Sequence, residues 1–124
     1  MNLVDSSGWI EYFVDGPKAK FFAAAIDDTD HLLVPTICLF EVFKKVLRDQ
    51  GESEALHVTM QMEEGQVIDL DCSLALRAAR LSFSTKLPMA DSIILATSQA
   101  FGATIWTQDA DFAKIKGVKY TPKS

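Results

Sequence analysis

Five short apolar runs are spaced along the chain, and polar or turn-forming residues separate them. They lie at residues 2–4, 31–37, 66–70, 103–106 and 118–120. Runs of this length that are apolar without alternation are typical of strands buried on both faces of a parallel sheet. We therefore predict four strands, with a fifth at the last of these runs.

Between the runs, apolar residues recur at the spacing of an α-helix. Helical segments are predicted around Trp9–Phe13 and at 18–26, 39–47, 52–62, 72–83, 90–101 and 110–115. Asp71 is placed to cap one of them, Pro88 suits the first turn of the next, and Gly102 suits its end. The segment 90–101 is apolar almost all round, which indicates a buried central helix. Strands that alternate with helices predict a single domain over residues 1–124, with a three-layer α/β/α fold around a parallel sheet of about four to five strands.

Composition narrows the class of protein. The chain has 124 residues and a net charge of −5, which argues mildly against a domain that coats nucleic acid by bulk charge. Cys38 and Cys72 lie in apolar segments and are expected to be buried thiols. His31 and His57 are too isolated to indicate a zinc site. The N-terminus lacks the basic start of a signal peptide, and no apolar run is long enough for a membrane span, so we expect a soluble cytoplasmic protein.

Acidic residues stand where the carboxyl ends of several predicted strands meet the following segments. Asp5 follows the first strand, and Asp109 and Asp111 follow the fourth. Glu41 lies early in the helix after the second strand, and Asp91 lies in the first turn of the buried helix. In parallel sheets these positions share one edge, where ligands bind. Converging carboxylates repel one another, and a hard cation such as Mg²⁺ relieves that repulsion.

Each of these acids also has an ordinary structural explanation. Asp5 and Asp109 could cap the helices that follow them, and Asp91 could favour the positive end of a helix dipole. Glu41 and Lys45 are spaced four residues apart, as in a common surface ion pair. The joint pattern favours a site, because Asp91 precedes the apolar stretch SIILA and would be costly to bury without a partner.

Three stretches together resemble a known family. They are LVDSS near the start, TICLFEVF around Glu41, and LPMADSIILATSQAFGATIWTQDADF across residues 87–112. In order and spacing, this chain resembles the PIN domain, and more specifically the VapC-like ribonuclease toxins of type II toxin–antitoxin pairs. The resemblance implies that an acidic metal site is formed by four catalytic residues: Asp5, Glu41, Asp91 and Asp109. It implies an accessory place for Asp111, and hydroxyl support of the first and last acids by Ser6 and Thr107. Ser7 is expected to be a helix N-cap.

The resemblance also implies the chemistry and the partners. Mg²⁺ or Mn²⁺ held by the acids would activate water for hydrolysis of an RNA phosphodiester, leaving a 5′-phosphate and a 3′-hydroxyl. Basic residues must contact the RNA phosphates, and the candidates are Lys44, Lys45, Arg48 and Lys86. Such toxins are usually homodimers that a cognate antitoxin blocks. The apolar segments 20–26 and 55–62 could line an exposed partner groove or pack in the core.

Three other functions remain as alternatives. A receiver-type signalling domain has a similar length and an acidic pocket, but LVDSS supplies only one acid after the first strand. DLDCS at 69–73 could be a phosphatase nucleophile motif, although it lies mid-chain. A PIN-like module that binds RNA or protein without catalysis would be expected to lack one of the acids, and here none is missing.

Overall fold

The computed structural model describes all 124 residues and contains one parallel sheet of five strands. The strands lie in the order β3–β2–β1–β4–β5, and every neighbouring pair is parallel. Their bounds are β1 (Asn2–Val4), β2 (Leu32–Pro35), β3 (Gln66–Ile68), β4 (Thr104–Thr107) and β5 (Lys119–Tyr120). All five strands lie within or one residue beyond the predicted runs, so the predicted fold class is confirmed.

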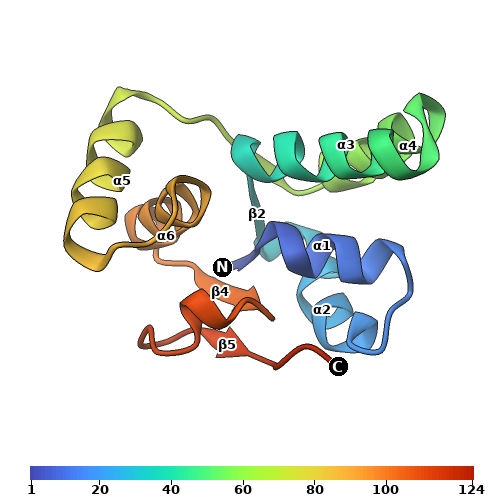
Figure 1. The fold of residues 1–124 in the computed structure, drawn as a ribbon. Coiled ribbons are helices and arrows are strands. Elements are labelled where there is room, and N and C mark those ends of the chain that lie inside the picture. The colour runs from blue at the N-terminus through green and yellow to red at the C-terminus, as the bar shows by residue number, and fades with distance from the viewer.

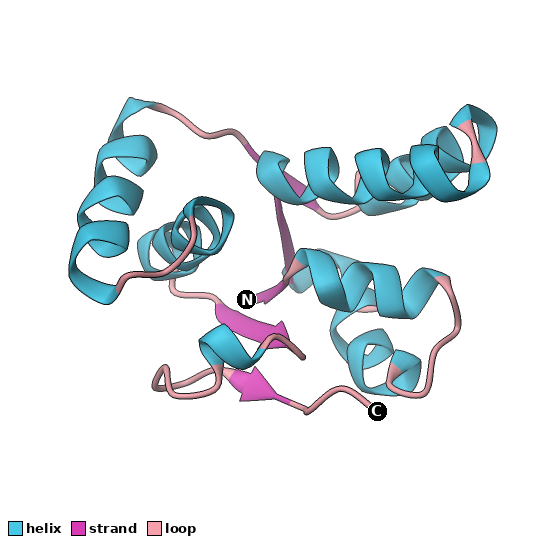
Figure 2. Cartoon of the chain, in the orientation of Figure 1, coloured by secondary structure: helices cyan, strands magenta, loops and turns pink.

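Six α-helices connect the strands and cover both sides of the sheet (Figure 1; Figure 2). They are α1 (Ser6–Phe13), α2 (Ala19–Ile26), α3 (Thr36–Gln50), α4 (Glu52–Met62), α5 (Cys72–Thr85) and α6 (Met89–Phe101). Two short 3₁₀ turns, η1 (Thr29–His31) and η2 (Ala110–Phe112), complete the chain. Figure 1 shows α5 and α6 on one side of the central strands, and α1 and α2 on the other.

The helix ends follow the local sequence closely. Asp71 caps α5 by accepting a hydrogen bond from the Leu74 amide, and Gly102 ends α6 with φ 63°. Pro88 stands at the N-cap of α6, one position ahead of the predicted first turn. The segment 110–115 forms only a three-residue 3₁₀ turn, η2. Its few apolar residues give a longer helix too little surface to pack.

The chain changes direction across the sheet at β1. From β1 it builds β2 and β3 on one side, and it then crosses back to build β4 and β5 on the other. The crevice between β1 and β4 is thus a topological switch point, where open α/β sheets bind their ligands. The pairing of Val4 with Trp106 brings Asp5 and Thr107 side by side at the carboxyl ends of these strands.

The core is built from the inner strands and the helix faces that lie against them. In α2, Phe22, Ala25 and Ile26 are buried, so segment 20–26 packs mainly in the core rather than in an open groove.

Cys38 is fully buried, as predicted, but Cys72 is exposed and that prediction was wrong. Cys72 is the first residue of α5, where only the side of the helix that faces α6 is covered. No helix in the structure is both long and apolar enough to cross a lipid bilayer.

Candidate metal centre

An acidic pocket of about 300 Å³ opens at the switch point. It is lined by nine residues from α1, α3, α6 and the loop after β4: Asp5, Ser6, Ser7, Ile10, Glu41, Lys45, Asp91, Ile94 and Asp109. The structure therefore brings together the four acids that the sequence proposes as metal ligands. They come from positions up to 104 residues apart, so the strand order rather than local sequence assembles them.

Asp5 is the deepest of the four acids, with only 2% of its surface exposed. Its Oδ1 accepts from the Gly8 amide at 2.9 Å, which makes Asp5 the N-cap of α1. The Thr107 hydroxyl donates to Oδ2 at 2.5 Å, and the Ser7 hydroxyl contacts both oxygens. Burial raises the pKa of Asp5 to about 6, although these three donors pull the pKa downward. The carboxylate is thus held in one orientation in a largely dry site.

The serine roles differ from the sequence prediction. Ser6 donates to Glu41 Oε1 at 2.6 Å, so it supports the second acid rather than the first. Ser7 was predicted to cap α1, but Asp5 does so, and Ser7 instead donates to Asp5. Both differences have one cause: α1 begins at Ser6, two residues earlier than an N-cap at Ser7 requires, which turns Ser6 toward α3. The sequence alone carries no signal for the Ser6–Glu41 contact, because the two residues are 35 positions apart.

Thr107, the last residue of β4, makes hydrogen bonds to two residues of the site, Asp5 and Asp109. Its hydroxyl donates to Asp5 and accepts from the Asp109 amide at 2.8 Å. The predicted contact with the last acid is therefore made through the Asp109 backbone rather than its carboxylate. A buried threonine is well suited to this bridge, since a hydroxyl group both donates and accepts.

Asp91 lies in the first turn of α6 and is partly buried, with no hydrogen-bonding partner. Its pKa is raised to about 7, first by burial and then by repulsion from Asp109, Asp111, Asp5 and Glu41. At neutral pH this carboxyl is only partly ionised without a bound cation. An arrangement of this kind binds a proton or a metal ion in competition.

Asp91, Asp109 and Asp111 form the tightest acidic group in the protein. One carboxylate oxygen from each lies within 4.8 Å of the others. Asp109 also caps η2 by accepting from the Asp111 amide, so its helix-capping role and its place in the pocket coexist. Hard oxygen donors at this separation fit Mg²⁺ or Mn²⁺, which retain some of their water ligands. Asp111 is exposed and does not line the acidic pocket, but it belongs to this group of three.

The four basic candidates are placed differently. Lys45 lines the acidic pocket, and its Nζ pairs with Asp49 at 2.9 Å. Arg48 pairs with the same carboxylate. Lys44 and Lys86 lie over phenyl rings, at 5.9 Å from the Phe40 centroid and 5.2 Å from the Phe83 centroid respectively. Of the four, only Lys45 therefore lines the acidic pocket, while Lys44 and Lys86 lie in two exposed aromatic–lysine pairs.

The segment 55–62 falls in α4, and it is only partly in the core. Ala55, Val58 and Met62 are buried, whereas Leu56 and Met60 are exposed. A groove of about 400 Å³ runs between α3 and α4 and is lined by Leu39, Phe40, Phe43, Lys44, Leu47, Thr59 and Glu63. A partly apolar groove is thus present beside α4, whereas segment 20–26 packs mainly in the core.

Comparison with known proteins assigns the chain to a family. The sequence profile of the PIN domain matches residues 3–118. No curated protein sequence matches the chain.

Solved structures of similar fold include a toxin–antitoxin complex and a toxin. A chain of a toxin–antitoxin complex from Klebsiella pneumoniae is 27% identical, with a TM-score of 0.80 and 95% of each chain covered. The toxin VapC20 from Mycobacterium tuberculosis, described as cleaving the sarcin–ricin loop, is 14% identical with a TM-score of 0.79, covering 96% of this chain and 98% of its own. A DNA-bound VapBC complex from Salmonella typhimurium is 14% identical with a TM-score of 0.75, covering 98% of both chains.

Proposed function

Because the chain belongs to the PIN domain family, we propose that it is a divalent-metal-dependent endoribonuclease, and that it is the toxin of a toxin–antitoxin pair. The observation that carries the proposal is the pocket at the switch point, where Asp5, Glu41, Asp91 and Asp109 converge. Carboxylates at this density repel one another, and a bound divalent cation relieves that repulsion.

The proposed roles of the acids follow from their surroundings. Asp91 and Asp109, with Asp111 beside them, would hold Mg²⁺ or Mn²⁺, since their oxygens already lie within 4.8 Å of one another. Asp5 faces the same pocket with its orientation fixed by hydrogen bonds, and Glu41 is fixed by Ser6. When bound, the cation would supply a water activated for attack on a phosphodiester and would stabilise the leaving oxygen.

The structure argues against two of the alternative functions, the receiver-type signalling domain and the phosphatase. The sheet order β3–β2–β1–β4–β5 differs from the 2-1-3-4-5 order of receiver domains. In DLDCS, Asp69 is exposed and Asp71 caps α5 after the edge strand β3, away from the acidic pocket. The motif is therefore a strand end and a helix cap. A PIN-like module without catalysis remains as an outcome of the test below.

The substrate and the partners are supported by the similar structures. VapC20 is described as cleaving the sarcin–ricin loop, which favours RNA as the substrate class. Several of the similar structures are toxin–antitoxin complexes, which favours a cognate antitoxin as a partner. The α3–α4 groove is our candidate for its docking, and a cytoplasmic homodimer is the state that we propose for the toxin.

RNA cleavage in the presence and absence of metal tests the proposal. We expect wild-type protein to cleave RNA with Mg²⁺ or Mn²⁺ and to stop in EDTA, and we expect Asp5→Ala and Asp91→Ala to lose cleavage. Equal cleavage by wild type and both variants would contradict the assignment of Asp5 and Asp91 to the catalytic site. No cleavage of any RNA by a folded, metal-loaded protein would favour a PIN-like module that binds RNA or protein without catalysis.

A biological test addresses the toxin assignment separately. Expression of the chain should arrest growth of a bacterial host, and co-expression of its antitoxin, sought as a short reading frame beside the gene of this chain, should relieve the arrest. Continued growth despite nuclease activity in the extract would contradict the toxin role and leave the nuclease proposal intact.

A further inference from the structure

Lys45 is the only basic side chain that lines the acidic pocket. It lies on α3, one turn after Glu41 and one turn before Asp49, so all three side chains share a face of the helix. The acids of the pocket have no ion-pair partner, because the ion pairs in the structure involve only His31–Asp28, Lys45–Asp49 and Arg48–Asp49. The cation nearest to the pocket is thus paired outside it.

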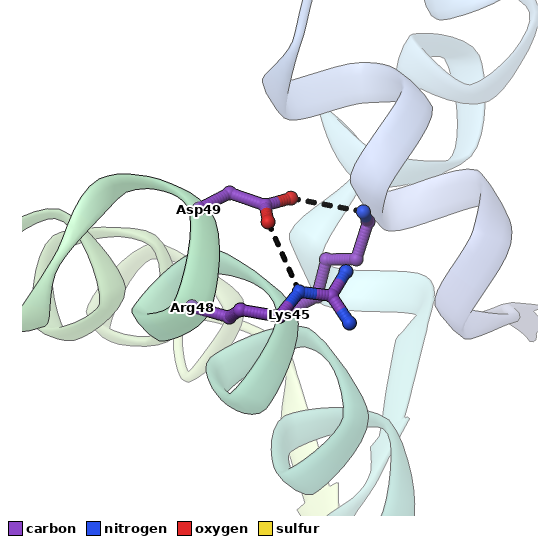
Figure 3. Close-up of polar contacts among 3 residues, drawn as sticks. All are labelled: Lys45, Arg48 and Asp49. Atoms are coloured by element: carbon purple, nitrogen blue, oxygen red, sulfur yellow. Dashed lines mark hydrogen bonds and ion pairs between the residues drawn. The ribbon is translucent and has the colours of Figure 1, made fainter.

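Asp49 holds Lys45 in this position together with Arg48. Figure 3 shows the two cations reaching the two oxygens of one carboxylate, Lys45 Nζ at 2.9 Å and Arg48 Nε at 3.1 Å. Hydrogen bonds from both lower the pKa of Asp49, which is therefore ionised at neutral pH. If Lys45 leaves, Asp49 keeps Arg48 as a partner.

Two features make movement of Lys45 easy. The side chains of the Lys45–Asp49 pair are 42% and 43% exposed, and exposed pairs at this spacing contribute little to stability. Lys45 also lines a second cavity of about 250 Å³ with Asp49 and Ile10, so its flexible four-carbon chain has open space beside it. The acidic pocket, in contrast, carries a strong negative potential that attracts an ammonium group.

We propose that Lys45 is a movable counter-ion of the acidic pocket. Asp49 holds its ammonium group outside the pocket while the pocket receives a cation, and the ammonium group then turns inward to contact the phosphate of bound RNA. This inference rests on the proposed nuclease function for its second half only. A single divalent ion leaves the four acids and a phosphodiester with excess negative charge, and Lys45 is the one side chain on the pocket wall able to reduce it. Asp49 is then a positioning residue.

A double-mutant cycle on Mn²⁺ binding tests the first half without any RNA. In Asp49→Asn, the freed ammonium should compete for the pocket and weaken Mn²⁺ binding about threefold to tenfold. In a Lys45→Met background, the same Asp49→Asn change should alter Mn²⁺ affinity less than about twofold, since no ammonium remains to compete. Free Mn²⁺ can be followed by electron paramagnetic resonance. Equal effects of Asp49→Asn in both backgrounds would overturn the movable counter-ion.

Cleavage kinetics test the second half. Lys45→Met should raise KM for RNA about tenfold or more and reduce the salt dependence of RNA binding by about one counter-ion, while Lys45→Arg should restore most of both. Lys20→Met, which removes an exposed lysine from α2, is the matched control and should change neither. A KM in Lys45→Met equal to that of the control would overturn the phosphate contact. Absence of cleavage by wild type would overturn the nuclease proposal instead, and the Mn²⁺ cycle would still decide whether Lys45 moves.

Discussion

Replacing Asp91 by Asn should stabilise the metal-free protein at high pH and leave it unchanged at low pH. Asp91 accepts no hydrogen bond, so the isosteric amide removes a charge without removing a bond to another residue. In the folded protein its pKa is raised from 3.8 to about 7 by burial and by four neighbouring acids. Folding therefore opposes ionisation of this group.

The sign and size of the effect follow from that pKa. Between about pH 4 and pH 7 the folded state binds a proton that the unfolded state has lost, so the free energy of unfolding falls as the pH rises through this window. A rise of about three pKa units corresponds to about 4 kcal/mol at full transmission. Solvent screens a half-exposed carboxyl, and we therefore expect Asp91→Asn to gain about 1–2 kcal/mol at pH 8. Below pH 4 the gain should vanish.

Urea denaturation in EDTA across pH 3.5–8 measures this effect, and a constant m-value would show that the denatured state is unchanged. Asp69→Asn, at an exposed acid without a hydrogen bond, is the matched control and should be neutral. Added Mg²⁺ should stabilise wild type more than Asp91→Asn at pH 8. An Asp91→Asn variant no more stable than wild type at pH 8 would contradict this prediction, and an equal gain at pH 3.5 and pH 8 would indicate a packing effect instead.

Three further predictions concern the same site and the thiols. Thr107→Val removes a donor that lowers the pKa of Asp5, so the pH at which cleavage reaches half its maximum should rise; an unmoved pH–rate profile would contradict this. Asp109→Asn should reduce cleavage by on the order of 100-fold or more and lessen thermal stabilisation by Mn²⁺, and a normal Mn²⁺ shift would remove it from the metal site. Burial raises the pKa of the Cys38 thiol while Cys72 is exposed, so a thiol reagent should titrate one group in the native protein and two in denaturant.

The sequence predicts the strands and the convergence of the acids well, for a physical reason. Leu3 and Val4 point to opposite faces of β1 and are both buried, and the acid that follows them is where the chain leaves the sheet. Parallel strands then oblige Asp5 and Asp109 to meet at one edge. Both features depend only on local pattern and on general rules of topology.

The contacts around the acids could not be predicted in the same way. Ser6 reaches Glu41 and Thr107 reaches Asp5 across separations of 35 and 102 residues, and both contacts depend on the starting residue of α1 and the register of β4. Cys72 was expected to be buried because its neighbours are apolar. It is exposed, because α6 covers only one side of α5. Pairing of Lys45 with Asp49 rather than with Glu41 also follows from side-chain rotamers, which no spacing rule fixes.

A crystal grown with Mn²⁺ tests most directly whether the acidic pocket holds a divalent cation. Anomalous scattering locates Mn²⁺ without reference to any assumed ligand. We predict a peak within coordination distance of carboxylate oxygens of Asp91 and Asp109, and its loss in crystals of Asp91→Asn grown under the same conditions. An empty pocket in wild-type crystals at millimolar Mn²⁺ and pH 8, or a peak bound only elsewhere on the protein, would contradict the account.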